Sequence, residues 1–489
     1  MYAGIDLGST NIKCAIYDRD MKLLARESAP VDYYREGGVV EFDALSYAKD
    51  VVSLVKRTME SAGTKALRGM AFTGQAETLV VLGADGRPLR RAISWMDDRS
   101  TEECAELEKL FPHEVCEAKT GQMAVLPTWP ATKILWLRRH EPETYEKAAS
   151  YMLLKDYVVY YLTGEKCSDM SIATFSFYFD IYNKCWWKEM LQAIGVRESQ
   201  LPPLCEPLTV AGNLLPQHKE ALGLSEDCFV SVGTLDHFAG MIGTGNLAPG
   251  GITLSTGTVM AMATLCREPI PKSCGIAMHY GFLPDTWIML PVAESGGVSL
   301  EWFKRACVPN NSFREIDDVV ASRQRNDLLF LPYIVGTSAP EFDMDASGAF
   351  LGLRDGTDAF DMAAAVMEGV AYVLRKNCEE MAEKGSKPEA IIATGGGAKS
   401  AVWCQFQADI TGLPVRVPLE KEAACLGSAM IAATMDGRFE SLKAASELCV
   451  SMVREYTPDA SEEEQTRLTR KFKKFCAFYD AALQVTRMN

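Results

Sequence analysis

The sequence predicts an α/β protein, because patterns typical of strands and of helices intermix along the chain. The chain has 489 residues, whereas a single hydrophobic core stops growing at roughly 250–300 residues. A strand-and-turn pattern near the middle of the chain also resembles the pattern at its start. Together these observations predict two similarly built domains, residues 1–246 and 247–489.

Composition and charge exclude several classes of protein. Against 50 lysines and arginines stand 65 aspartates and glutamates, a formal net charge of −15. Such a chain is repelled by nucleic acids and anionic membranes, so we expect neither as a partner. No stretch approaches the ~18 apolar residues of a membrane span. The 15 cysteines form no CxxC pair and there are only 5 histidines, which argues against a structural metal. We expect a cytoplasmic protein with reduced thiols, and no signal peptide.

The first half opens with strand patterns at residues 2–7, 13–17 and 22–26, separated by turns at 8–10 and 18–20. A helix follows over residues 43–61, with Asp43 as its N-cap and Gly63 at the C-cap position. Further strands are predicted at residues 70–73 and 79–82. Helices are predicted at 132–139 and 155–162, the second closed by Gly164.

The second half begins after a Pro/Gly break at residues 246–251. Its first strand, Gly251-Ile252-Thr253-Leu254, echoes Gly4-Ile5-Asp6-Leu7 at an offset of 247 residues. A helix is predicted at residues 359–384, a strand at 390–394 and a helix at 398–411. The last helices are predicted at 422–435 and 461–484.

Three turns rich in glycine, serine and threonine each follow a predicted strand. They are Gly8-Ser9-Thr10, Ser255-Thr256-Gly257-Thr258 and Gly395-Gly396-Gly397. Glycine lets a phosphate approach the backbone, and free amides and hydroxyls can donate to its oxygens. The alternative is that each turn merely reverses the chain. None matches the P-loop pattern.

Only the first of the two repeated hairpins carries charge. It has Asp6 and Lys13, where the repeat has Thr253 and Met260. A carboxylate beside a phosphate-binding turn can hold Mg²⁺ directly or through water. A lysine can offset the charge that develops on a transferring phosphoryl group. The first half therefore has the groups needed for metal-assisted phosphoryl transfer.

Three further stretches resemble signatures of the FGGY carbohydrate kinases, in the superfamily of sugar kinases, actin and heat-shock-chaperone ATPases. They are Gly348-x-Phe350-x-Gly352-Leu353 with Asp361-Met362-x-x-Ala365-Val366-Met367-Glu368, then Pro130-x-x-Lys133-Ile134-x-Trp136-Leu137, and Gly395-Gly396-Gly397-Ala398-x-Ser400-x-x-Trp403-x-Gln405-x-x-Ala408-Asp409. The resemblance implies two ribonuclease-H-like (actin-like ATPase) domains with a cleft between them. It also implies that ATP binds mainly to the second domain and a sugar to the first.

The resemblance assigns roles to residues by position. Phosphates would be approached by Ser9, Thr10, Asn11 and Lys13, with Thr256 and Gly257 on the other side, and the nucleotide pocket would be lined by Gly297, Gly396 and Ser400. The catalytic base would be Asp236, which would orient the sugar hydroxyl and accept its proton. By local sequence alone, Asp236 also reads as a helix N-cap.

The sugar site is expected to draw on Gln75, Glu77, Trp95 and Asp98, together with Asp236 and His237. Carboxylates and amides bind sugar hydroxyls, and aromatic faces contact the sugar's apolar side. The alternatives are a solvated charge run at residues 97–99 and a core tryptophan.

Several departures from the family pattern leave the substrate open. Ala76 stands where glycerol kinases have arginine, and Thr128 where an aromatic is usual. We expect phosphorylation of a ketopentose of the xylulose or ribulose type, with ATP and Mg²⁺. The alternatives are a glycerol, tetritol or other polyol kinase, an actin- or chaperone-like ATPase, and a non-catalytic sugar sensor. The oligomeric state stays open, with a homodimer as one option.

Overall fold

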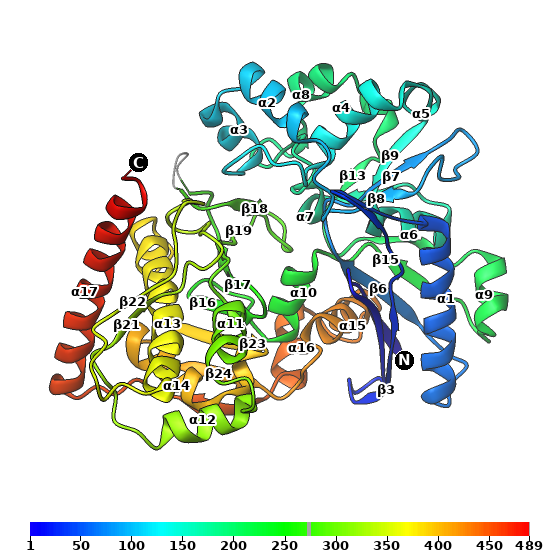
Figure 1. The fold of residues 1–489 in the computed structure, drawn as a ribbon. Helices are drawn as coiled ribbons and strands as arrows, with labels where there is room; N and C mark the ends of the chain where they lie inside the picture. The colour runs from blue at the N-terminus through cyan, green and yellow to red at the C-terminus, as the bar shows by residue number, and fades with distance from the viewer. Residues whose placement is uncertain (271–274, 489) are drawn as a thin grey trace.

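The computed structural model describes residues 1–270 and 275–488, and each half of the chain is built on its own mixed sheet (Figure 1). The first sheet has six strands in the order β14-β15-β6-β1-β2-β3. The strands are β1 Tyr2–Leu7, β2 Asn11–Tyr17, β3 Leu23–Pro30, β6 Gly69–Gly74, β14 Val210–Asn213 and β15 Phe229–Ser231.

The second sheet has the order β18-β19-β17-β16-β23-β24-β25, with β20 also paired to β17. Its strands are β16 Gly251–Thr256, β17 Met260–Cys266, β18 Met278–Tyr280, β19 Trp287–Met289, β20 Val292–Ala293, β23 Ala390–Gly395, β24 Val415–Pro418 and β25 Met452–Tyr456. Both sheets start with an antiparallel hairpin whose first strand pairs in parallel with a later strand, β6 or β23. This shared topology confirms the predicted α/β fold with two similar halves.

The strands of the two halves correspond at an offset of 249 residues, because β1 spans Tyr2–Leu7 and β16 spans Gly251–Thr256. The predicted offset of 247 is therefore wrong by two residues. A shift of two residues keeps every side chain on the same face of the strand. The alternation of side chains between the two faces therefore looks the same at either offset, and a match of four residues could not tell them apart. The residue matching Asp6 is thus Ser255, which is also uncharged.

The helices that the sequence predicts are present near their expected positions, together with others that it does not predict. The first half contains α1 Ala44–Ser61, α4 Pro130–His140, α6 Leu154–Thr163, α7 Met170–Ala173 and α10 Asp236–Gly243, and the second half contains α11 Gly297–Cys307, α12 Phe313–Ala321, α13 Ala359–Glu383, α14 Ala401–Thr411, α15 Ala423–Met435 and α17 Glu462–Thr486. The Asp43 side chain caps α1 as predicted, accepting from the Ser46 amide at 2.6 Å. Among the described residues, no helix is long and apolar enough to cross a membrane.

The glycine-rich turn after β23 does not open α14 directly. A 3-10 turn over Gly397–Lys399 intervenes, so the predicted helix start at residue 398 is wrong. The Ser400 side chain caps the helix instead, accepting from the Trp403 amide at 3.2 Å. Gly395 has a φ of 78°, whereas Gly397 is already the first residue of the 3-10 turn.

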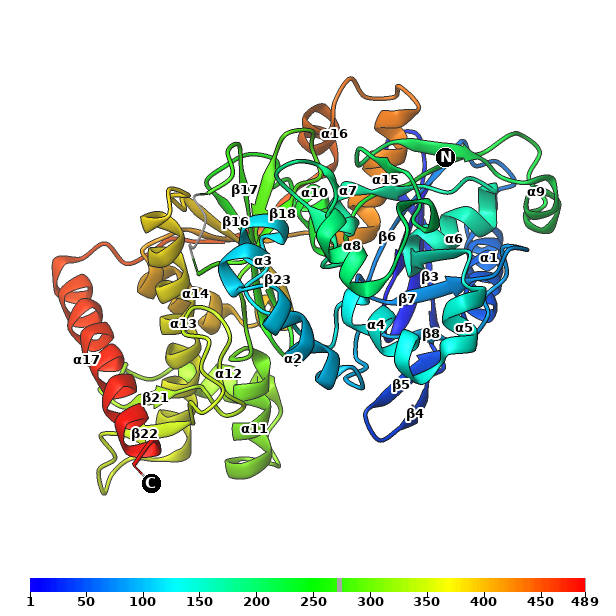
Figure 2. The same ribbon diagram turned by 90° about the horizontal axis from the view of Figure 1, so that it is seen from above.

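The two faces of the first sheet pack against different parts of the chain. Ala3, Ile5 and Leu7 lie in a core shared with α1 and α6. The alternate residue Gly4 faces α15, which belongs to the second half by sequence. Because strand side chains alternate, Asp6 lies on the same face as Gly4. Figures 1 and 2 show α10 and α15 together between the two sheets.

Glycines let α10, α15 and β1 approach backbone to backbone. A Cβ on Gly243 would lie 1.8 Å from the Ala423 carbonyl oxygen, and one on Gly4 1.9 Å from that of Cys425. A Cβ on Gly427 would lie 2.0 Å from the Ala239 carbonyl oxygen. Real atoms do not approach this closely, so any side chain here would push the elements apart. We call this contact of α10, α15 and β1 the glycine joint.

Replacing Gly243 by alanine tests the glycine joint. We expect Gly243→Ala to lower the free energy of unfolding by about 2 kcal/mol, because the new methyl group must displace α15. Urea denaturation monitored by fluorescence measures this. The matched control is Gly240→Ala on the same helix, where a Cβ would meet nothing within 4 Å. Equal stability of the two variants would show that the joint is not tightly packed.

Candidate active site

Three acidic side chains gather where β1 and β6 end and α10 begins. Asp6 pairs in register with Thr73 near the end of β1, and Glu77 follows β6 in a turn with a φ of 56°. Asp236 is the first residue of α10. Burial, and then the charge of Asp236, raise the pKa of Asp6 to about 7. Burial and the same charge also raise the pKa of Glu77, despite the opposing charge of Lys133. Asp6 and Glu77 therefore both lie close enough to Asp236 for its charge to raise their pKa values.

Asp236 does not cap its helix. The N-cap position is Leu235, and the Asp236 carboxylate accepts from the adjacent His237 amide at 2.6 Å. The capping interpretation of this aspartate is therefore wrong by one residue.

Lys13 forms an ion pair across the glycine joint. Its Nζ lies 2.7 Å from Oε2 of Glu422, the residue just before α15. Burial alone would lower the pKa of Lys13, but the hydrogen bond to Glu422 and the charge of Asp6 raise it. Lys13 is thus held as a cation beside the acidic cluster. Sequence reasoning missed Glu422, which lies 409 residues away in the chain.

The turn of the first half that we expect to bind phosphate is in contact with the expected sugar loops. Trp95 Nε1 donates to Ser9 Oγ at 2.7 Å, and Gln75 Nε2 donates to the Gly8 carbonyl at 3.3 Å. The Trp95 residue is 40% exposed, so it is not a core tryptophan. Thr10 is exposed and Asn11 half-buried on the same turn.

Asp98 lies apart from this cluster. It is exposed, and its carboxylate lies against Gly38 in the hairpin of β4 Tyr34–Glu36 and β5 Val39–Phe42. Its neighbour Asp97 is buried and accepts from the Val40 amide at 2.6 Å. The interpretation of residues 97–99 as a solvated run thus fits Asp98 and fails for Asp97.

Lys133 forms hydrogen bonds to several loops of the expected sugar site. It is fully buried on α4, and its Nζ donates to the carbonyls of Thr128, Ser94 and Glu77 at 2.6, 2.7 and 3.2 Å. Burial lowers the pKa of Lys133 to about 7. Thr128 adds a further link, because its hydroxyl donates to the Trp95 carbonyl at 3.0 Å. Lys133 belongs to a signature motif, yet its role could not be read from the sequence.

His237 brings the second half of the chain close to the acidic cluster. Burial, and then the charge of His237, lower the pKa of His279 on β18 to about 3. His279 stacks on Phe175 with ring centroids 4.4 Å apart, and its Nδ1 lies 3.1 Å from Gln122 Nε2. A strand of the second half thus lies close enough to His237 for the two imidazole rings to interact electrostatically.

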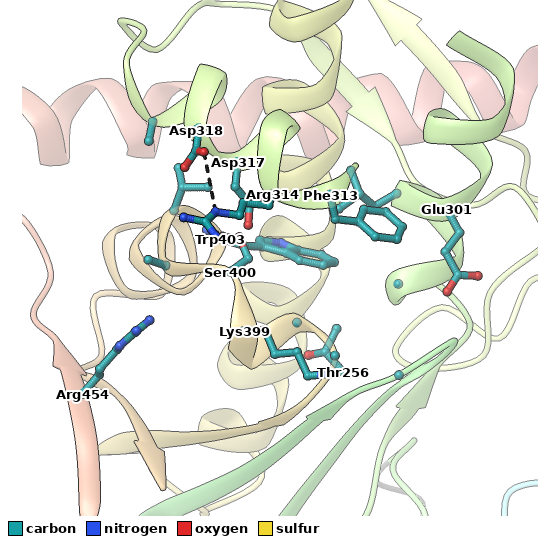
Figure 3. A pocket seen from close by; sticks show the side chains of 18 of the residues that line it. Thr256, Glu301, Phe313, Arg314, Asp317, Asp318, Lys399, Ser400, Trp403 and Arg454 are labelled. Atoms are coloured by element: carbon teal, nitrogen blue, oxygen red, sulfur yellow. Dashed lines mark hydrogen bonds and ion pairs between the residues drawn. The ribbon is translucent and has the colours of Figure 1, made fainter. Parts of the chain in front are cut away.

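A pocket of about 760 Å³ opens beside the two glycine turns of the second half (Figure 3). It is lined by Gly297, Gly396 and Ser400, the residues expected in a nucleotide pocket, and by Thr256 and Gly257, which are expected beside the phosphates. Gly297 must be a glycine, because a Cβ would lie 2.5 Å from the Gly257 carbonyl oxygen. Sequence reasoning missed the polar and aromatic side chains that complete the wall, which are Phe313, Arg314, Asp317, Asp318, Lys399 and Arg454.

The site contains groups that suit a divalent cation. Among residues 1–270 and 275–488, no three His, Cys, Asp or Glu side chains are arranged to hold a metal on their own. Mg²⁺ is commonly held by one or two carboxylates plus water and phosphate oxygens. Asp6, with its pKa raised by burial and by neighbouring charge, fits that role.

Comparison with known proteins agrees with this geometry. The N-terminal domain model of the FGGY family of carbohydrate kinases matches residues 1–243, and the C-terminal domain model matches residues 252–435. The xylulose kinase of Bacillus subtilis is 30% identical over 469 residues, covering 94% of this chain and 93% of the relative. The gluconokinase of the same organism is 27% identical, covering 95% and 93%.

Solved structures show the same fold. A structure described as a xyloylose kinase from Brucella ovis superimposes with a TM-score of 0.92 at 26% identity, covering 99% of both chains. Plasmodium falciparum glycerol kinase with ADP superimposes with a TM-score of 0.90 at 20% identity. The two matched domain models and the relatives that align over nearly the whole chain show that this chain belongs to the FGGY family of carbohydrate kinases.

Proposed function

We propose that the protein transfers the γ-phosphoryl group of ATP to a hydroxyl of a ketopentose of the xylulose or ribulose type. The observation that carries the proposal is the cluster of Asp6, Glu77 and Asp236 beside the phosphate-binding turn. The relatives named xylulose kinase, among them that of Escherichia coli at 30% identity, support the choice of sugar. A cytoplasmic location and a homodimer stay predictions.

In this proposal Asp236 orients the sugar hydroxyl and accepts its proton as the new P–O bond forms. Lys13 and the hydroxyls of Ser9 and Thr10 would face the phosphates from one side, and Thr256 with Gly257 from the other. The adenosine would occupy the pocket next to Gly297, Gly396 and Ser400. Asp6 would hold Mg²⁺, directly or through water, and the bound ion supplies positive charge to the phosphate oxygens.

The charge of the site favours a neutral substrate. Asp6, Glu77 and Asp236 are all acidic, while the two nearest lysines are already engaged. Lys13 is paired with Glu422, and Lys133 donates to three carbonyls. A sugar acid such as gluconate would meet repulsion without a free cation to offset it. This disfavours the activity named for the gluconokinase relative.

The size of the site disfavours glycerol as the main substrate. Ala76 and Thr128 are smaller than the arginine and the aromatic residue that glycerol kinases carry, which leaves room for a longer sugar. The loops around Trp95 and Glu77, which contact the turn of the first half, also disfavour an ATPase that acts on protein partners.

A coupled-ADP assay across xylulose, ribulose, glycerol, erythritol and gluconate tests these choices. ATP turnover that no sugar stimulates would contradict the proposal.

Changing the proposed base should separate chemistry from binding. We expect Asp236→Asn to lower kcat by about 10²–10⁴-fold, because the amide cannot accept the hydroxyl proton. Sugar affinity, measured by calorimetry, should change little. The matched control is Asp480→Asn, an exposed carboxylate on α17. Full activity in Asp236→Asn would refute the assignment of the base.

The raised pKa of Asp6 predicts a pH-dependent cost in stability. Its pKa is about 7 in the folded chain and 3.8 for an ordinary aspartate, so the folded state holds this proton between those values. Stability should therefore fall as pH rises from about 4 to about 7 and then level off. We expect Asp6→Asn, measured without Mg²⁺, to exceed the wild type in stability by about 1 kcal/mol or more at pH 8. The gain should vanish near pH 4.

Thermal unfolding at pH 4, 6 and 8 measures this effect. The same variant should lose Mg²⁺-dependent phosphoryl transfer. If the thermal stability of the wild type and that of Asp6→Asn change in parallel with pH, Asp6 does not have the raised pKa that the prediction requires.

A further inference from the structure

The segment of residues 232–235 leads from β15 into α10 and determines where Asp236 stands. Gly233 has a φ of 70°, and a Cβ there would lie 1.6 Å from the Phe72 carbonyl oxygen. The Thr234 amide donates to that same carbonyl at 3.3 Å. Thr234 is fully buried and Val232 nearly so. Asp236 therefore follows directly after a short segment that packs tightly against β6.

A buried ion pair holds the start of this segment. Lys155 on α6 and Asp169, the N-cap of α7, are both fully buried, with Nζ and Oδ2 2.5 Å apart. Lys155 Nζ also donates to the Val232 carbonyl at 2.6 Å. Asp156 lies 3.6 Å away on the same helix as Lys155. Charge-assisted bonds of this kind are short and directional, so they fix the carbonyl in place.

A second contact runs from the same aspartate to the middle of the segment. Asp169 Oδ1 accepts from the Ser171 amide at 3.0 Å and also from the Ser171 hydroxyl. The Ser171 and Thr234 hydroxyl oxygens lie 2.7 Å apart. Thr73 Oγ1 donates to the Thr234 carbonyl at 2.8 Å, and Thr73 is the register partner of Asp6. Thr234 is thus bound from α7 and from β6 at once.

We infer that Lys155, Asp169, Ser171 and Thr234 form a positioning unit for Asp236. This rests on the proposed function, in which Asp236 is the base. A buried ion pair adds little net stability, because desolvation offsets the attraction. It does set geometry, and a base misplaced by about 1 Å can lose on the order of 100-fold in rate. All four residues are fully buried. They act through the backbone of residues 232–235.

The unit is tested at Thr234, where the hydroxyl can be removed without changing side-chain shape. We expect Thr234→Val to lower kcat for the ketopentose by about tenfold, while KM and the sugar's Kd change by less than about twofold. Thr234→Ser retains the hydroxyl and should keep kcat near the wild-type value. Ser171→Ala removes the same bond from its other end. The double variant should lose no more than Thr234→Val alone.

The matched control is Thr163→Val on α6, which removes a buried hydroxyl that donates to the Val159 carbonyl at 2.8 Å. It should lower thermal stability to a similar degree without changing kcat. Equal kcat in Thr234→Val and Thr163→Val would overturn the inference, and so would loss of kcat in Thr234→Ser. If Thr234→Val does not fold, Ser171→Ala decides by the same comparison. A wild-type chain that phosphorylates no sugar would refute the proposed function itself.

Discussion

The site depends on one packing contact, the glycine joint of α10, α15 and β1. Asp236 starts α10, Glu422 precedes α15, and Asp6 lies two residues beyond Gly4 on β1. The same backbone contacts that join the two halves therefore determine the spacing of the acidic cluster. Any change that separates the helices also separates the base from the proposed Mg²⁺ ligand. Because interiors are close-packed, the joint can only shift as a unit.

The charges at this joint oppose the folding of the site. Burial raises the pKa of Asp6 and that of Glu77, and the charge of Asp236 raises both further. Such an arrangement costs stability in the free protein, and a bound cation would relieve it. This is the pattern expected of a site that binds magnesium and phosphates, where function outweighs local stability. Lys13 offsets part of the repulsion, and Glu422 keeps it in place.

Features set by local sequence could be predicted, and those set by long-range packing could not. The hairpin at the start of each half and the helix capped by Asp43 follow from short patterns. Five residues that line the pocket of the second half could be singled out in advance, because the composition of two turns points to Thr256, Gly257 and Gly396 and the family resemblance adds Gly297 and Ser400. Their roles stay predictions. Glu422 carries no local signal, because its partner Lys13 lies in the other half of the chain. Asp98 is adjacent to the buried Asp97 in sequence, yet its own carboxylate lies against Gly38, away from the acidic cluster's strands β1 and β6.

Two fully buried lysines on helices hold the loop segments that carry the proposed site residues. Lys133 on α4 and Lys155 on α6 are fully buried, and both donate to backbone carbonyls of segments that carry site residues. An apolar side chain of similar length would fill the same space, but it could not bind several carbonyls at once. The ammonium group has three donors on a long stem, so it can bind loops that do not contact each other. In this chain Lys133 holds the loops of the expected sugar site, and Lys155 holds the segment that leads to the proposed base. The geometry that phosphoryl transfer would require is thus supported by lysines that are themselves fully buried.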